Sequence, residues 1–128
     1  MKDFRSLVFW QKAHQFVLDL YRATKTFPED ERFELISQIR RAAVSIPSNI
    51  AEGCGRHGDA ELKRFLQIAM GSASEVEYQL QLSKDLGYLG SMEFSKMNTE
   101  LIQTKKMLNA FIQKLTVTTK SQPPIAKR

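Results

Sequence analysis

The sequence has little of what marks secreted or membrane-spanning proteins. It contains one cysteine, Cys54, among 128 residues, so it forms no internal disulfide and does not indicate an oxidising compartment. No stretch approaches the roughly 20 apolar residues that a transmembrane helix needs. Polar residues interrupt the N-terminal run MKDFRSLVFWQKAHQFVLDL, which excludes a signal peptide. We therefore expect a soluble, cytoplasmic protein with no membrane partner.

Groups that carry out catalysis or hold metals are also scarce. The two histidines, His14 and His57, fall in different segments, and the lone cysteine has no partner at metal-ligand spacing. Glu52 and Glu75 can face each other across two helices, but with Arg41 nearby they are better interpreted as salt-bridge partners than as an acid and a base. We expect no enzymatic activity, no metal and no cofactor.

Positive charge exceeds negative charge. Nineteen Lys and Arg residues against 14 Asp and Glu give a formal net charge of +5. Such a surplus favours a polyanionic partner, nucleic acid among them, without specifying one. The length suits one domain with a single core.

Apolar residues recur at spacings of three and four in four segments, and no segment shows the alternation of a strand. The segments are residues 9–24, 36–50, 62–80 and 94–115. We expect Pro28 and the acidic residues 29–31 to begin the second helix, Asp59 and Ser91 to cap the third and fourth, and Gly87 to end the third.

Helices joined by such short links predict an all-α fold, an antiparallel up-and-down four-helix bundle over residues 1–118. Pro47 lies inside the second helix, where it removes a backbone hydrogen bond, so we expect a kink there. Residues 119–128, TKSQPPIAKR, lack periodicity and predict a disordered basic tail.

Gly53, Gly55 and Gly58 have the G-x-G-x-x-G spacing of a dinucleotide-binding loop. That motif needs a strand before it, and here a helix precedes it, so we interpret the glycines as a turn between helices. Arg56 and His57 precede the third helix, whose N-terminus can hold a phosphate. The alternative is an ordinary solvated turn.

The second helix has one apolar face more than a monomeric bundle needs. Besides its core face, Val44, Pro47 and Ala51 form a second, partly apolar sector, which predicts an interface between copies of the chain. Between the two faces runs a polar stripe. We interpret this stripe as part of a structural network of hydrogen bonds and ion pairs with the third helix. The members of the network are Arg41, Ser45, Asn49, Glu52, Ser72 and Glu75. The alternative is that the arginines of this helix contact phosphate.

The stretches QIRRAAVSIPSNIAEGCGR and ELKRFLQIAMGSASEVEYQL closely resemble the 23S rRNA intervening-sequence proteins, also called the S23 or four-helix-bundle protein family. The likeness extends from VFWQKAHQFVLDLY to FIQKL. In this chain the family motif falls on Arg40, Arg41, Ser45, Pro47, Asn49, Glu52, Gly53, Arg56, Phe65, Gly71, Ser72 and Glu75. Cys54 stands where an aromatic residue is common in the family.

The resemblance implies a four-helix bundle that assembles as a ring-like homopentamer, positively charged on part of its surface. Some members are encoded in intervening sequences of bacterial 23S rRNA genes. The accessory proteins of diversity-generating retroelements look like relatives, and they bind nucleic acid and a partner reverse transcriptase.

Together these features predict a non-catalytic, homo-oligomeric protein that binds nucleic acid, RNA rather than DNA. The candidate contacts are Arg40, Arg56, His57, Lys63, Arg64, Lys105 and Lys106. The alternative hypothesis is a scaffold that docks a protein partner such as a reverse transcriptase, with the charge secondary.

Overall fold

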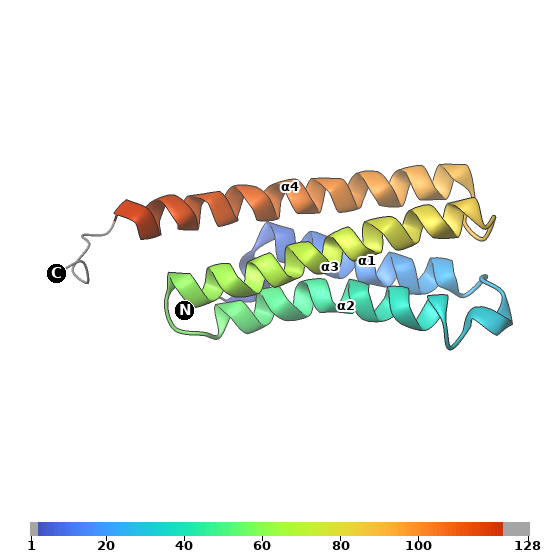
Figure 1. Ribbon diagram of the computed structural model, residues 1–128, viewed down its shortest axis with the longest axis horizontal. Helices are drawn as coiled ribbons and strands as arrows, with labels where there is room; N and C mark the ends of the chain where they lie inside the picture. The colour runs from blue at the N-terminus through green and yellow to red at the C-terminus, as the bar shows by residue number, and fades with distance from the viewer. Residues whose placement is uncertain (1–2, 122–128) are drawn as a thin grey trace.

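A computed structural model describes residues 3–121 of the chain, with side chains up to Thr116. These residues form four α-helices and two short 3-10 helices, with no strand among them. In chain order the elements are η1 (Phe4–Ser6), α1 (Val8–Thr24), η2 (Glu29–Glu31), α2 (Leu35–Cys54), α3 (Asp59–Asp85) and α4 (Ser91–Ser121). Each α-helix runs antiparallel to the one before it (Figure 1). The predicted all-helical, four-helix fold is confirmed.

The core follows from the helical spacing of the apolar residues. Most of the predicted core positions of α2 and α3 are almost fully buried, while Ile36 and Leu62, the first of each series, are only partly buried. Helix α2 packs on both α1 and α3, and α4 closes the bundle against α1 and α3. Burying one Leu or Ile side chain stabilises the fold by about 1.5–3 kcal/mol. The largest buried side chains are Phe16, Leu20, Ile39, Ile46, Ile50, Leu66, Val76, Leu80, Leu101 and Leu108.

The helix ends differ slightly from the predicted ones. Gly87 adopts φ 81° after α3, and the amide of Tyr88 donates to the carbonyl of Ser83 at 2.9 Å, so the predicted glycine stop is confirmed. Asp59 is the first residue of α3 rather than its cap, and Gly58, with φ 85°, takes the capping position. A left-handed residue there reverses the chain, and glycine adopts it without strain.

The acidic residues 29–31 do not open α2 as predicted. They form η2, and α2 begins only at Leu35. Tyr88 donates its hydroxyl to Glu31 at 2.8 Å and so ties η2 to the turn between α3 and α4. This hydrogen bond holds the pKa of Tyr88 above its usual value.

Two further predictions concern a kink in the second helix and the end of the domain in the fourth. Helix α2 passes through Pro47 without interruption, and the kink expected there stays a prediction. Helix α4 reaches Ser121, beyond the predicted domain boundary at residue 118, and residues 122–128 of the predicted tail lie outside the described residues. None of the helices in the described part is long and apolar enough to cross a bilayer.

Candidate nucleic-acid and subunit interfaces

Two guanidinium groups lie over the same aromatic ring at the turn between α2 and α3. The Arg56 guanidinium carbon is 4.9 Å from the centre of the Phe65 ring, and that of Arg64 is 4.5 Å away. Arg56 also pairs with Glu52 at 2.8 Å, and Arg64 with Glu61 at 3.2 Å. The hydrogen bond from Arg64 lowers the pKa of Glu61. Both guanidinium groups are therefore held in defined positions.

Four of the predicted nucleic-acid contacts gather at this end of the bundle. His57 is exposed in the turn, and Lys63 is half-buried on the first turns of α3, beside Arg64 and near Arg56. Three carboxylates share this end with the three cations, those of Glu52, Asp59 and Glu61. The α2–α3 end is therefore close to neutral when His57 is uncharged.

The remaining three candidates lie elsewhere. Arg40 is half-buried against α1, where its Nε donates to Thr24 Oγ1 at 2.8 Å and its Nη2 to the carbonyl of Tyr21 at 3.2 Å. Lys105 pairs with Glu77 of α3 at 2.7 Å. Lys106 is exposed on α4. The structure therefore does not join all seven candidates into one surface.

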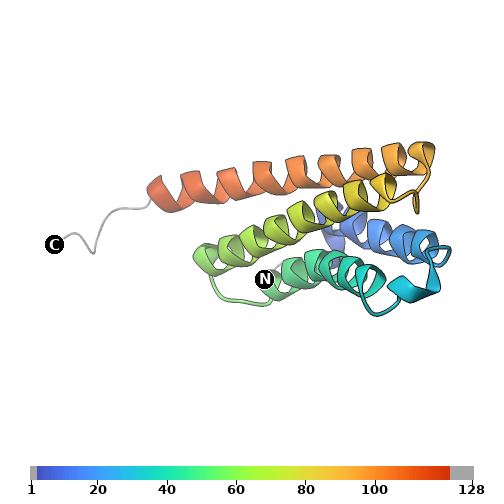
Figure 2. The same cartoon turned by 45° about the vertical axis from the view of Figure 1, so that its right-hand side comes forward.

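Two of the predicted contacts, Lys105 and Lys106, belong to a longer basic stretch that the sequence analysis did not identify as a unit. Residues 101–128 contain six Lys or Arg and no Asp or Glu. Three of the cations lie in the C-terminal half of α4, which extends past the α2–α3 turn (Figures 1 and 2). The six are Lys105, Lys106, Lys114, Lys120, Lys127 and Arg128. A block of one charge sign is the signal that would have identified it.

The predicted polar network forms only in part. The hydroxyls of Ser45 and Ser72 are 2.8 Å apart and link α2 to α3, and Asn49 Nδ2 donates to Ser45 Oγ at 2.9 Å. Asn49 Nδ2 also donates to the Ser45 carbonyl at 2.8 Å. Each helix therefore contributes a hydroxyl to one small cluster between them.

The other three members bond to residues four positions away in the sequence and not across the two helices. Arg41 donates to Ser37 at 3.5 Å, Glu52 pairs with Arg56, and Glu75 accepts from Gln79 at 3.2 Å. Arg41 and Glu75 do line the same groove between α2 and α3, but no ion pair joins them in the described part of the chain.

We expect Ser45→Ala to lower the free energy of unfolding by about 1 kcal/mol, because it leaves Ser72 and Asn49 without a shared partner in a half-buried site. Urea unfolding followed by circular dichroism measures the change. Ser74→Ala, at an exposed position of α3, is the matched control and should change little. Equal effects of the two substitutions would show that the Ser45–Ser72 contact adds nothing.

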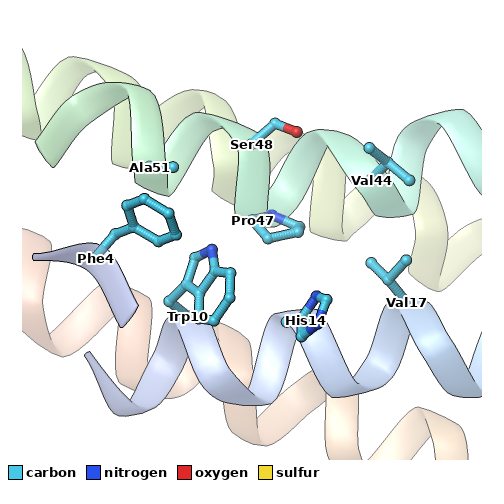
Figure 3. Close-up of a pocket in the computed structure, with 8 residues that line it drawn as sticks. All are labelled: Phe4, Trp10, His14, Val17, Val44, Pro47, Ser48 and Ala51. Carbon is cyan, nitrogen blue, oxygen red and sulfur yellow. The ribbon is translucent and has the colours of Figure 1, made fainter. Parts of the chain in front are cut away.

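The predicted subunit-interface residues line one groove between α1 and α2. Val44, Pro47 and Ala51 of α2 face Trp10 and other residues of α1 and η1 across a groove of about 370 Å³ (Figure 3). We call it the Trp10 groove, and its full lining is Phe4, Trp10, His14, Val17, Val44, Pro47, Ser48 and Ala51.

Aromatic rings build one wall of this groove. The Trp10 ring stacks on His14 at 4.9 Å, with 11° between the planes, and meets Phe4 edge-on at 5.0 Å. His14 is thus part of an aromatic stack. Among the described residues no group of three or more His, Cys, Asp or Glu side chains is placed to hold a metal ion.

The comparisons with known proteins agree with the fold. The sequence model of the family described as "23S rRNA-intervening sequence protein" matches residues 5–110. A solved structure of a protein of unknown function from the S23 ribosomal protein family of Bacteroides thetaiotaomicron VPI-5482 shares 26% sequence identity, with a TM-score of 0.77. The alignment covers 83% of this chain and 96% of that one. No curated protein matches.

Proposed function

Because the chain belongs to the 23S rRNA-intervening sequence protein family, we propose that it is a non-catalytic, homo-oligomeric protein that binds nucleic acid, RNA in preference to DNA. The observation that carries the proposal is the acid-free stretch of residues 101–128, with its six cations. One of the six, Lys105, pairs with Glu77 of α3. Lys and Arg side chains bind phosphates by releasing counterions, and this binding is largely independent of sequence.

The charge on the rest of the chain is nearly balanced, which makes the C-terminal half of α4 the main candidate surface. Residues 1–100 contain 13 Lys or Arg and 14 Asp or Glu, because 19 minus the six cations of residues 101–128 leaves 13. The net charge of +5 thus comes entirely from the last quarter of the sequence. A basic arm on a neutral body suits attachment to a polyanion.

Assembly would strengthen this binding. We propose that the Trp10 groove is covered by another copy of the chain and that the assembly is a ring of five, as the family resemblance implies. Five copies carry a formal charge of +25, five times the +5 of one chain. Several basic arms in one particle bind one RNA with a high effective concentration.

We expect Lys106→Glu to weaken binding to a 23S rRNA fragment about five- to tenfold at low salt. We also expect the slope of log affinity against log salt concentration to become shallower by the amount that corresponds to about one phosphate contact. The reason is that Lys106 is an exposed cation in the acid-free stretch. Electrophoretic mobility shift at two salt concentrations measures both quantities.

Lys96→Glu is the control, since Lys96 is also exposed on α4 but lies near Glu93 and Glu100. It should have the smaller effect. If the unmodified protein shifts no RNA at low salt, the proposed function is wrong. If the two variants bind RNA equally well, the acid-free stretch is not the contact surface.

A further inference from the structure

A second groove follows α1 and α2 toward the turn that joins them. It has a volume of about 520 Å³, and Val44 separates it from the Trp10 groove. Its walls combine aromatic rings, guanidinium groups and a hydroxyl, contributed by Tyr21, Arg32, Phe33, Ser37, Arg40 and Arg41. We call it the Phe33 groove.

The aromatic rings of this groove are unusually accessible. Phe33 is 84% exposed, although phenylalanine is ordinarily among the buried residues. Tyr21 is 39% exposed. An arginine lies over each ring. The guanidinium carbon of Arg40 is 4.5 Å from the centre of the Tyr21 ring, and that of Arg32 is 5.4 Å from the centre of the Phe33 ring.

The groove is also lined by positive charge. Its lining includes three arginines and no carboxylate, and one of the three, Arg32, pairs with Glu29 outside the groove at 3.2 Å. Arg40 is fixed in place by its hydrogen bonds to Thr24 and to the Tyr21 carbonyl. Arg41, the next residue of α2, is exposed and donates to Ser37 at 3.5 Å, and no carboxylate of the described residues forms an ion pair with its guanidinium. A fixed and an adaptable cation beside each other suit a backbone of phosphates.

We propose that the Phe33 groove binds unpaired nucleotides of single-stranded RNA, with a base stacked on the Phe33 ring and the flanking phosphates held by Arg40 and Arg41. Proteins that bind single strands combine a positively charged groove with aromatic rings on which bases stack. Bases in a duplex are stacked on one another and do not reach such a ring. The groove therefore selects unpaired over paired RNA, and this inference rests on the proposed function.

The test uses a short single-stranded RNA that carries a fluorescent adenine analogue, whose emission falls when it stacks on an aromatic ring. We expect Phe33→Ala to weaken binding about fivefold or more and to abolish the quenching. Phe33→Tyr should retain both, because tyrosine keeps the aromatic face. Tyr78→Ala, which removes another exposed ring (64%) on α3, is the control and should leave both unchanged.

A second pair of variants tests the cations. For binding to the single strand, Arg41→Gln should make the slope of log affinity against log salt concentration shallower by the amount that corresponds to about one phosphate contact. Arg22→Gln removes the same charge from α1, where Arg22 pairs with Asp19, and should not reduce it. Binding to a fully paired duplex of the same sequence should change less than binding to the single strand when Phe33 is replaced.

The outcomes separate this inference from the proposed function. If the unmodified protein binds no RNA, both fail. If it binds RNA through Lys106 while Phe33→Ala leaves affinity and quenching unchanged, the Phe33 groove is not an RNA site and the proposed function stands. If Phe33→Ala breaks the oligomer in sedimentation without RNA present, the groove is covered by another copy, and the inference is overturned.

Discussion

Sedimentation of the Ala51→Glu variant is expected to show single chains, while the unmodified protein is expected to sediment as a larger assembly. Ala51 is half-buried on the wall of the Trp10 groove, opposite aromatic rings that another copy would cover. A carboxylate placed in a covered apolar groove loses its hydration and finds no Lys or Arg among the residues that line it. The cost of burying such an unpaired charge is several kcal/mol and recurs at every contact of a ring.

The same result is expected for Val44→Glu. Val44 is 37% exposed, so a single chain tolerates glutamate there, and glutamate is a good helix former. Both variants should therefore keep the helical circular dichroism of the parent while the mass falls. Since Val44 also borders the Phe33 groove, Ala51→Glu is the cleaner test of the Trp10 groove alone.

Ile68→Glu provides the matched control. Ile68 is 41% exposed on α3 and lies outside both grooves, so the same change in charge and size should leave the assembly intact. Unchanged sedimentation of both Val44→Glu and Ala51→Glu would mean that another face joins the copies. A parent protein that sediments as a single chain at all concentrations would remove the oligomer altogether.

The core was predictable because the spacing of apolar residues in the sequence indicates which positions are buried. Ile39, Ala43, Ile46 and Ile50 recur at spacings of three and four, and all four side chains are inaccessible to solvent. The hydrophobic pattern fixes which side of a helix faces inward. The pattern does not fix the exact rotation of each helix about its own axis. Polar contacts at the edge of the core depend on that rotation.

The polar stripe shows where sequence reasoning fails. Spacing placed Arg41 and Ser45 on one side of α2, yet Ser45 reaches α3 and Arg41 bonds one turn back on its own helix. A long side chain has many rotamers, and a partner four residues away in the same helix competes with one across the interface. A serine side chain is short and has few rotamers, so its hydrogen-bond partner is set once the helix backbones are close.

Ion pairing between residues three or four positions apart could be predicted from the sequence, and it changes the ranking of the candidate phosphate contacts. Glu52 precedes Arg56 by four residues and Glu61 precedes Arg64 by three, spacings that favour ion pairs on a helix. Arginines with such partners are poorer phosphate ligands than exposed lysines without them. Lys106 therefore ranks above Arg56 and Arg64, although all three are basic and exposed.

Gly53→Val is expected to lower the free energy of unfolding by about 3 kcal/mol, a large share of the roughly 5–15 kcal/mol that stabilises a typical domain. A Cβ atom at Gly53 would lie 3.0 Å from the Cβ of Phe65 and 3.1 Å from a methyl carbon of Leu62. The Phe65 Cβ is attached to the backbone of α3 and cannot swing aside, so α2 and α3 must separate at this end. Gly53 thus serves helix packing rather than the phosphate loop that its motif resembles.

Gly55→Val separates this contact from the general effect of replacing a glycine. Gly55 has ordinary helical φ and ψ, and a Cβ there would meet only carbonyl oxygens of its own helix, the nearest at 3.6 Å. We expect a change of about 0.5 kcal/mol or less for Gly55→Val in urea unfolding. Because Phe65 carries both Arg56 and Arg64, Gly53→Val should also displace these guanidinium groups. Equal destabilisation by the two valines would show that the close approach of α2 and α3 at Gly53 does not limit packing.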